Sequence, residues 1–297
     1  MAPSSAGLMK RVKSVLPPSG RHWVGNGFHV YPVFANKAFT AELSPWLMFD
    51  YAAPKSFPPT SSKLGVGTHP HRGFETVTIA FQGEVEHGDS VGNRDVIGPG
   101  DVQWMTAARG IIHEEYHSTN FAKTGGTFEM CQLWLNLPKK DKMKKPEYQP
   151  ILAKQIPTAT TSTDCSVRVI AGTCHGVTGP AKTHTPVNLW DIALPTANRP
   201  VEIEVPANHN TIVFVRRGKI AVGPSEKPHE VESQGVALMH RDGDILRIDP
   251  KEKDTQVLLL GGEPIDEPIA AQGPFVMNTH DEIRQAHMDF MSGKLGR

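Results

Sequence analysis

The chain lacks most features that assign a protein to a class at first sight. Its three cysteines, Cys131, Cys165 and Cys174, are odd in number and have no C-x-x-C spacing, which argues against a disulfide framework and favours a reducing compartment. Lysine plus arginine (31) balances aspartate plus glutamate (31), so net charge draws the chain neither to nucleic acid nor to an anionic membrane. Its longest apolar runs, such as residues 257–260, are far too short to cross a bilayer.

A secretory signal is also missing from the start of the chain. The opening MAPSSAGLMKRVKSVLPPSG has basic residues but no apolar segment of signal-peptide type. We expect a cytoplasmic protein, also nuclear if its source is eukaryotic, and a monomer. A length of 297 residues allows two domains of ordinary size or one large β architecture.

Helical periodicity is scarce, whereas turn residues are abundant. The chain has 27 glycines and 25 prolines, and short apolar runs separated by turn residues follow one another from Trp46 onward. The segment VTIAFQGEVEHGDS (77–90) has a strand–turn–strand pattern, and in VIGPGDVQWM (96–105) a Pro-Gly turn separates two further strands. The pattern predicts an all-β protein built as a sandwich or barrel.

The second half of the chain faintly resembles the first. FVRRGKIAVG (214–223) echoes AFQGEVEHG (80–88), and RDGDILRID (241–249) echoes GPGDVQWMT (98–106), which suggests two copies of one β unit. Between them, LPKKDKMKKPEYQP (137–150) has the lysine- and proline-rich composition of a solvated connector. We expect an N-terminal domain over 1–136, a linker over 137–150 and a C-terminal domain over 151–297, with the chain ends free to cross between the two domains.

One helix is expected near the C-terminus, in NTHDEIRQAHMDFM (278–291). Thr279 and Glu282 have capping-box spacing. The side chains that share one face of this helix are Ile283, Ala286, His287 and Phe290. On that face His287 is interpreted as a packed side chain rather than a metal ligand.

Two histidines stand one residue apart in THPHRGFET (68–76). Side chains at i and i+2 of a strand point to one face, so His69 and His71 share a face, together with Glu75 if no bulge intervenes. Pro70 removes a backbone donor between the histidines, which indicates a sheet edge or a bent strand at a barrel rim.

The arrangement recurs in GIIHEEYH (110–117). Here His113, Glu115 and His117 share a face, while Glu114 points the opposite way. Imidazole and carboxylate are the usual ligands of borderline divalent metals, so two strands that each offer ligands at i and i+2 could surround one ion inside a barrel. Neither cluster contains cysteine, which disfavours a closed structural zinc site. Three histidines with one carboxylate suit iron(II), manganese, nickel or copper, with one or two positions left for water, substrate or dioxygen.

Three motifs closely resemble those of the pirin family within the cupin superfamily: HPHRGFETV (69–77), GPGDVQWMTAARGIIHEE (98–115) and GPFVMNTHDEI (273–283). The resemblance extends from about Trp46 to Phe290. It implies a bicupin fold, in which two jelly-roll β-barrels face each other, with a short C-terminal helix. The N-terminal barrel would hold one metal. The C-terminal barrel would be a degenerate copy, in agreement with the lack of an H-x-H in the second half.

By position, the resemblance implies four metal ligands: His69, His71, His113 and Glu115. The implied cofactor is Fe(II), with Mn, Ni or Cu as alternatives. Glu75 aligns with a carboxylate that many other cupins use as a ligand and pirins usually do not, which leaves it a candidate for a role beside the ligands. His117 lies outside the family's ligand set.

The resemblance first implies an enzyme. Several pirins resemble flavonol 2,4-dioxygenases, which open the quercetin ring with O2 and release carbon monoxide. Glu115 would then be the catalytic base as well as a ligand. The side chains that could pack against a planar substrate, with core packing as the alternative for each, are Phe74, Trp104 and Met105.

The alternative is regulatory binding. Some eukaryotic pirins resemble iron-dependent, redox-sensing coregulators that bind protein partners, and a bacterial member could tune a metabolic enzyme by contact. Arg72, Arg94 and Arg109 could form a basic patch near the cup mouth, or simply face water. No basic helix or groove-reading motif indicates direct nucleic-acid binding. An open pocket above the metal would favour the enzyme.

Overall fold

The computed structural model describes residues 7–161 and 165–297 of the chain, which divides into two compact units. The first barrel comprises Ser19–Gln155 and Ile265–Arg297. The second barrel comprises the chain before Ser19 together with Ile156–Pro264. No helix in the described part of the chain is long and apolar enough to span a membrane.

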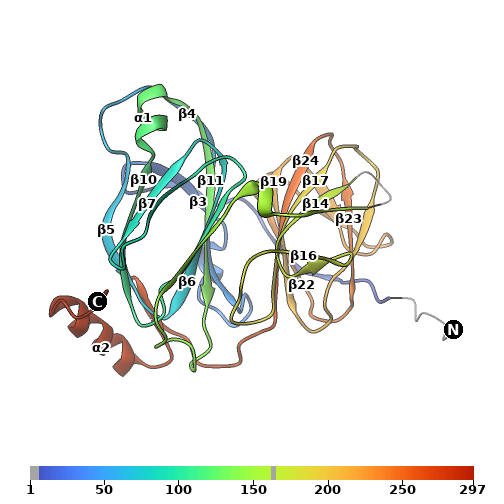
Figure 1. Ribbon diagram of the computed structural model, residues 1–297. Coiled ribbons are helices and arrows are strands. Elements are labelled where there is room, and N and C mark those ends of the chain that lie inside the picture. Colours follow the sequence, from blue (N-terminus) through green and yellow to red (C-terminus); the bar gives the residue numbers. More distant parts are fainter. Residues whose placement is uncertain (1–6, 162–164) are drawn as a thin grey trace. The chain divides into compact units, whose positions relative to one another are not determined.

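The first barrel is built from two antiparallel sheets (Figure 1). The larger sheet contains, in spatial order, β12 (Glu147–Ile151), β9 (Val102–Thr106), β6 (Phe74–Gln82), β11 (Gly126–Asn136), β4 (Trp46–Phe57), β3 (Phe28–Pro32) and β2 (His22–Val24). The smaller sheet contains β5 (Gly65–His71), β10 (Ile111–His117), β7 (Val85–Asp89) and β8 (Arg94–Ile97). From β4 to β11 the chain alternates between the sheets except at the β7–β8 hairpin, which is the jelly-roll arrangement.

The second barrel repeats this plan. Its larger sheet contains β1 (Val12–Leu16), β22 (Val236–Met239), β19 (Asn210–Arg217), β24 (Thr255–Gly262), β17 (Val187–Leu194), β14 (Ser166–Ala171) and β13 (Thr158–Thr160). Its smaller sheet contains β18 (Val201–Glu204), β23 (Ile245–Pro250), β20 (Ile220–Val222) and β21 (His229–Val231). Short pieces outside these sheets are β15 (Thr173–Cys174), β16 (Val177–Thr178), β25 (Ala270–Gln272), β26 (Phe275–Met277), α1 (Thr119–Thr124), and the 3-10 turns Ala35–Lys37 and Ala153–Gln155.

The strand orders match one to one, so the expected internal repeat and the all-β class are confirmed. The first sequence echo compares equivalent elements, because it pairs β6–β7 with β19–β20. The second echo is wrong by one strand. It pairs β9 with β23, whereas β9 corresponds to β22 and β23 to β10. Gly-Asp turns recur before several strands of a barrel, so they identify a turn without identifying which strand follows.

The two units differ from the domain boundaries expected from the sequence. Strand β1 pairs with β22 of the second barrel, and the chain from Ile265 onward returns to the first barrel. The stretch 137–150 belongs to the first barrel, and its last residues begin β12, which pairs with β9. Lys142 within this stretch is buried. Its ammonium donates to the Gly73 carbonyl, the Asn136 side chain and the Val276 carbonyl, and these three hydrogen bonds compensate for the loss of water. The other four lysines of the stretch are exposed, so among its lysines the expected solvated surface fails only at Lys142.

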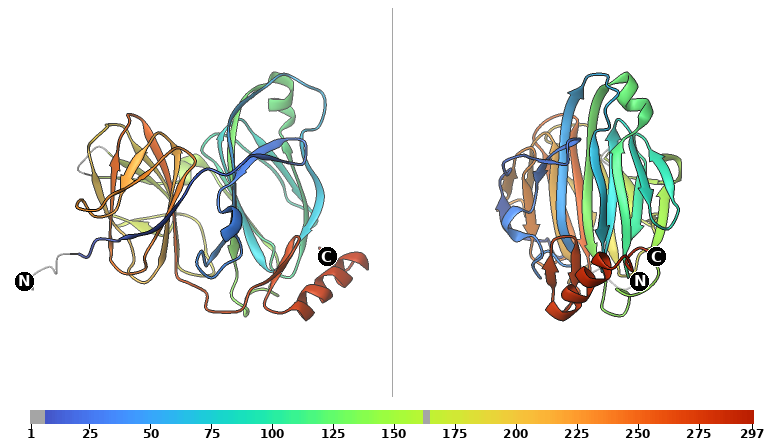
Figure 2. Two further views of the ribbon diagram at one scale, coloured as in Figure 1. Left: turned by 180° about the vertical axis from the view of Figure 1, so that it is seen from behind. Right: turned by 90° about the vertical axis from the view of Figure 1, so that its left-hand side faces the viewer.

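The predicted C-terminal helix is present as α2, His280–Met291, drawn in red in Figure 2. Thr279 caps it, and the reciprocal capping box with Glu282 is formed. Ile283 and Ala286 are buried against the first barrel, while Phe290 is 37% exposed. His287 packs edge-on against Phe275, so it is a packed side chain as expected.

The interior of the second barrel is closed by apolar side chains. Its strands β18 and β23 hold the positions that β5 and β10 hold in the first barrel, and they contribute to its core Val201, Ile203, Leu246 and Ile248. Within residues 7–161 and 165–297, both groups of histidines and acids close enough to hold an ion lie in the first barrel. The described part of the second barrel thus has no counterpart of the histidine cluster.

Candidate metal centre

Three histidines meet because β5 and β10 pair antiparallel. In this pairing His69 lies directly opposite His113, and His71 lies opposite Ile111. The register shifts between His113 and Glu115, which marks a β-bulge in this pair. Strand β5 is the outer strand of the smaller sheet, so the sheet edge that Pro70 indicates is confirmed.

The three imidazoles form a compact group. Ring centroids are 4.2 Å apart for His69 and His113, 4.8 Å for His69 and His71, and 4.9 Å for His71 and His113. The nitrogen atoms that the group can offer to an ion lie within 4.8 Å of one another. Nδ1 of His69 lies 2.8 Å from the Gly67 carbonyl oxygen, and Nδ1 of His71 lies 3.3 Å from that of Pro274. An N–H donated from Nδ1 leaves the Nε2 lone pair free for an ion.

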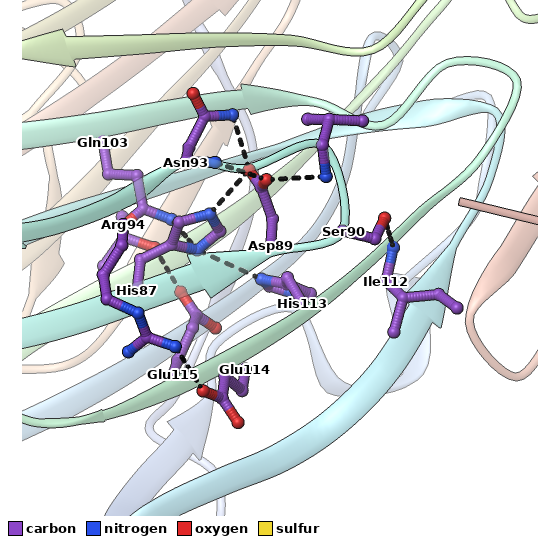
Figure 3. Close-up of polar contacts among 12 residues, drawn as sticks. His87, Asp89, Ser90, Asn93, Arg94, Gln103, Ile112, His113, Glu114 and Glu115 are labelled. Atoms are coloured by element: carbon purple, nitrogen blue, oxygen red, sulfur yellow. Dashed lines mark hydrogen bonds and ion pairs between the residues drawn. The ribbon is translucent and has the colours of Figure 1, made fainter. Parts of the chain in front are cut away.

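His113 is oriented by a further histidine, His87 of β7, which no motif in the sequence had marked (Figure 3). Nε2 of His87 lies 3.1 Å from the Asp89 carboxylate, and its Nδ1 lies 3.0 Å from the Gln103 amide nitrogen and 3.4 Å from Nδ1 of His113. Both nitrogens of His87 are therefore engaged, and contact with Nδ1 of His113 turns the Nε2 of His113 toward the other histidines.

Glu115 extends the group along the same face of β10. It forms, with His87 and His113, a second set of ligand atoms within 4.8 Å of one another. Its carboxylate accepts from the Gln132 amide at 2.6 Å and from the Thr78 hydroxyl at 3.3 Å. The four residues expected to bind metal are therefore spread over two overlapping groups that share His113, and the second group also contains His87. Glu114 points away, as expected, and pairs with Arg94.

The charge state of the cluster suits a cation. Burial, aided by neighbouring His69, lowers the pKa of His71 to about 3, and burial with the surrounding histidines holds the pKa of His113 well below its usual range. Both imidazoles are therefore neutral near pH 7, which is the form that binds metal. Nε2 of His71 and Nε2 of His113 are buried without a hydrogen-bond partner. Buried polar atoms are rarely left so, and a divalent cation among them would satisfy both.

A cavity of about 310 Å³ opens beside the cluster. His69, His71 and Glu115 lie in its wall. The remaining lining residues are Val24, Phe28, Val30, Met48, Asp50, Val66, Met130, Gln132, Trp134 and Pro274. Most of the wall is apolar, as in sites for planar organic ligands.

The cavity lining differs from the one expected. Trp104 and Met105 are fully buried and do not line it, and Phe74 lies behind the wall, with its ring centroid 4.3 Å from that of Trp134 and 5.0 Å from that of His71. Much of the wall comes from β3, β4 and β11, and Met48 of β4 and Met130 of β11 lie in no motif that would have marked them. The one local signal that could have placed these two methionines inside the barrel is the alternation of inward and outward side chains along each strand.

Glu75 and His117 lie apart from the cluster. A turn at Gly73, whose φ is +91°, separates β5 from β6 and breaks the parity that would have placed Glu75 beside the histidines. Glu75 accepts instead from Trp104 and Thr106, and burial raises its pKa to about 7. Burial also lowers the pKa of His117 to about 4, and this ring stacks on Phe128.

The C-terminal segment braces the turn that carries His71. The backbone N–H of Val276 donates to the Arg72 carbonyl at 3.0 Å. The Arg72 side chain is buried and paired with Asp289 of α2 at 2.8 Å. Arg94 is exposed but engaged with two glutamates, Glu86 and Glu114. Of the two alternatives for Arg72, Arg94 and Arg109, the basic patch is therefore not formed.

A two-sheet jelly roll with a histidine and carboxylate cluster on its smaller sheet defines a metal-binding cupin. The sequence model of the pirin family matches residues 27–135, and that of the pirin C-terminal cupin domain matches residues 189–296. A Pseudomonas aeruginosa protein named "putative quercetin 2,3-dioxygenase" is 49% identical over 97% of this chain and 99% of its own length. Human pirin is 34% identical over 86% of this chain and 83% of its own length.

Comparison with solved structures indicates the same family. The crystal structure of a quercetin 2,3-dioxygenase from Acinetobacter baumannii superimposes with a TM-score of 0.92 at 47% identity, covering 97% of this chain and 99% of that one. The chain belongs to the pirin family. The family and the bicupin fold expected from its three motifs are confirmed.

Proposed function

We propose that the protein is a metal-dependent dioxygenase of the pirin type, which opens the ring of flavonols such as quercetin with O2 and releases carbon monoxide. The observation that carries the proposal is the histidine cluster, whose unpartnered Nε2 atoms lie beside an apolar cavity of about 310 Å³. That volume is at the lower end of the roughly 300–1,000 Å³ typical of small-molecule sites. The names of the two relatives with about half of their residues identical support the same activity.

The proposed metal ligands are His69, His71, His113 and Glu115, and the proposed metal is Fe(II), with Mn, Ni or Cu as alternatives. A divalent metal held there would supply Lewis acidity and a site for O2 chemistry. The neutral histidines support this set, because His71 and His113 do not have to lose a proton to bind a cation. The catalytic base assigned to Glu115 from the sequence stays a prediction.

The apolar walls give the chain its means of orienting a planar substrate. Trp134 and Phe28 present aromatic surface, and Met48 and Met130 present flexible thioethers that adapt to a ring face. Displacing water from such a wall favours an aromatic ligand and strengthens every polar interaction inside the cavity.

The alternative proposal, an iron-dependent regulator that senses redox state and binds a protein partner, needs no cavity of this size. The basic patch that would have supported it is not formed, since Arg72 is buried and paired with Asp289. A monomeric state and a regulatory partner stay predictions.

The test is aerobic decay of quercetin by iron-loaded protein, followed by absorbance with the carbon monoxide trapped by haemoglobin. We expect turnover with carbon monoxide released, and loss of both bound iron and turnover in His113→Ala. Glu114→Gln is the matched control, because Glu114 is the neighbouring acid on the opposite face of β10 and should leave turnover intact. Stoichiometric bound iron without turnover would refute the enzyme and favour the regulator.

A further inference from the structure

Asp50 of β4 is a second acid of the cavity, apart from the histidine cluster. The strand register places it opposite Gln132 of β11, and Gln132 lies opposite Thr78 of β6. Gln132 and Thr78 both donate to Glu115, so this row of side chains faces the inside of the barrel. Cross-strand neighbours have Cβ atoms about 4.5–5.5 Å apart, so Asp50 lies one side chain away from the residue that holds Glu115.

The carboxyl of Asp50 faces the cavity rather than a donor. The side chain is half-buried in the cavity wall, and none of the described residues contributes a hydrogen bond to its pKa, whereas Glu129 of the same barrel accepts from Tyr51 and Gln82. Burial alone raises the pKa of Asp50 to about 7. A polar group kept unpartnered in an apolar wall costs stability, and such groups gather where a ligand or a reaction uses them.

Few charges face Asp50 across the cavity. On β3 and β11, which flank β4, the cavity-lining side chains are uncharged: Phe28, Val30, Met130, Gln132 and Trp134. The titratable groups in the opposite wall are His69, His71 and Glu115. A cation bound at the cluster would lower the pKa of Asp50 and hold it as a carboxylate at neutral pH.

We propose that Asp50 is a catalytic acid–base residue that takes the hydroxyl proton of a flavonol bound in the cavity. The substrate O–H bond breaks, an O–H bond forms on the Asp50 carboxylate, and the electron pair stays on the substrate oxygen as an anion. Glu115 is less suited to this step because it is a proposed metal ligand and also accepts from Gln132 and Thr78, contacts that hold its carboxylate in place. The inference rests on the proposed function, and it replaces the base assigned to Glu115.

The test compares wild type with Asp50→Asn, which keeps the shape of the side chain and removes its basicity. Asp281→Asn, on the exposed surface of α2, is the matched control. Each metal-loaded protein is mixed with quercetin without O2, and the absorption spectrum reports whether the bound flavonol is neutral or anionic. We expect anion with wild type and Asp281→Asn and neutral flavonol with Asp50→Asn, with metal content and melting temperature unchanged.

In air, kcat/KM of Asp50→Asn should fall by about 100-fold or more, the usual contribution of a general base. Bound anion in Asp50→Asn, equal to that in wild type, would overturn the inference and return the base role to Glu115. Anion bound by wild type but never consumed would refute the proposed dioxygenase while the spectra still support proton transfer to Asp50. Failure of wild type to bind quercetin would overturn both.

Discussion

Arg72 offers a sharp test of how the C-terminal segment supports the histidine cluster. It directly follows His71, and its side chain is 6% exposed. Its Nη1 donates to Asp289 at 2.8 Å, and its Nε donates to the Arg109 carbonyl at 2.6 Å. The pairing holds the pKa of the Asp289 carboxyl below its usual range. Arg72→Met keeps the aliphatic stem and removes both hydrogen bonds.

The loss of stability expected for Arg72→Met follows from the burial of the ion pair. Removing one partner of a buried ion pair costs about 3–5 kcal/mol, and Asp289, at 19% exposure, can recover some hydration, so we expect about 3 kcal/mol. In a domain of 150–250 residues, each kcal/mol lowers the melting temperature by about 2–4 °C, which predicts a shift of about 6–12 °C. Arg72→Met should also loosen the turn that carries His71. Loss of a residue that supports a metal ligand typically weakens metal affinity by about 10–100-fold.

The assay is thermal unfolding of the metal-free protein, followed by metal competition against a chromophoric chelator. Arg94→Met is the matched control, because Arg94 is 59% exposed and paired with two glutamates on the surface. Exposed pairs contribute about 0–1 kcal/mol, so the control should melt near wild type with its metal affinity unchanged. Equal melting shifts in the two variants, or unchanged metal affinity in Arg72→Met, would refute the bracing role.

Glu75→Gln should keep the metal content of wild type, because Glu75 accepts hydrogen bonds from Trp104 and Thr106 and lies apart from the cluster. His69→Ala should lose most of its metal, and elemental analysis measures both variants. Full metal content in His69→Ala would contradict the proposed centre. His117→Gln should flatten the acid dependence of stability in metal-free protein. The pKa of His117 is about 4 folded against an ordinary 6.5, so the unfolded chain binds the proton first and wild type should lose about 3 kcal/mol as pH falls from 6.5 to 4. Denaturant titrations at several pH values check this, and parallel slopes for the two proteins would refute it. Trp134→Ala should raise the KM for quercetin about tenfold with metal content unchanged, because the indole lines the cavity; an unchanged KM in steady-state assays would place the substrate elsewhere.

Local patterns in the sequence determined the elements of the fold. Alternation and Gly-Pro turns predicted strands, and the capping box of Thr279 and Glu282 predicted helix α2. The same period of two placed His69 and His71 on one face of their strand, and His113 and Glu115 on one face of theirs. Pro70 indicated the sheet edge that β5 occupies. These predictions succeed because side-chain direction within one strand or helix depends only on local backbone geometry.

Only the tertiary structure decided how the elements meet. It placed His87 behind His113, Asp50 beside Gln132, and β1 and β12 in barrels that their positions in the chain do not suggest. It also excluded Glu75, because a turn at one glycine reverses strand parity. Register across strands and closure of a barrel depend on contacts between residues far apart in sequence, which no local pattern encodes. The candidate ligands can therefore be read from the chain, whereas the walls of the cavity, and the acid within them, could be found only in the folded barrel.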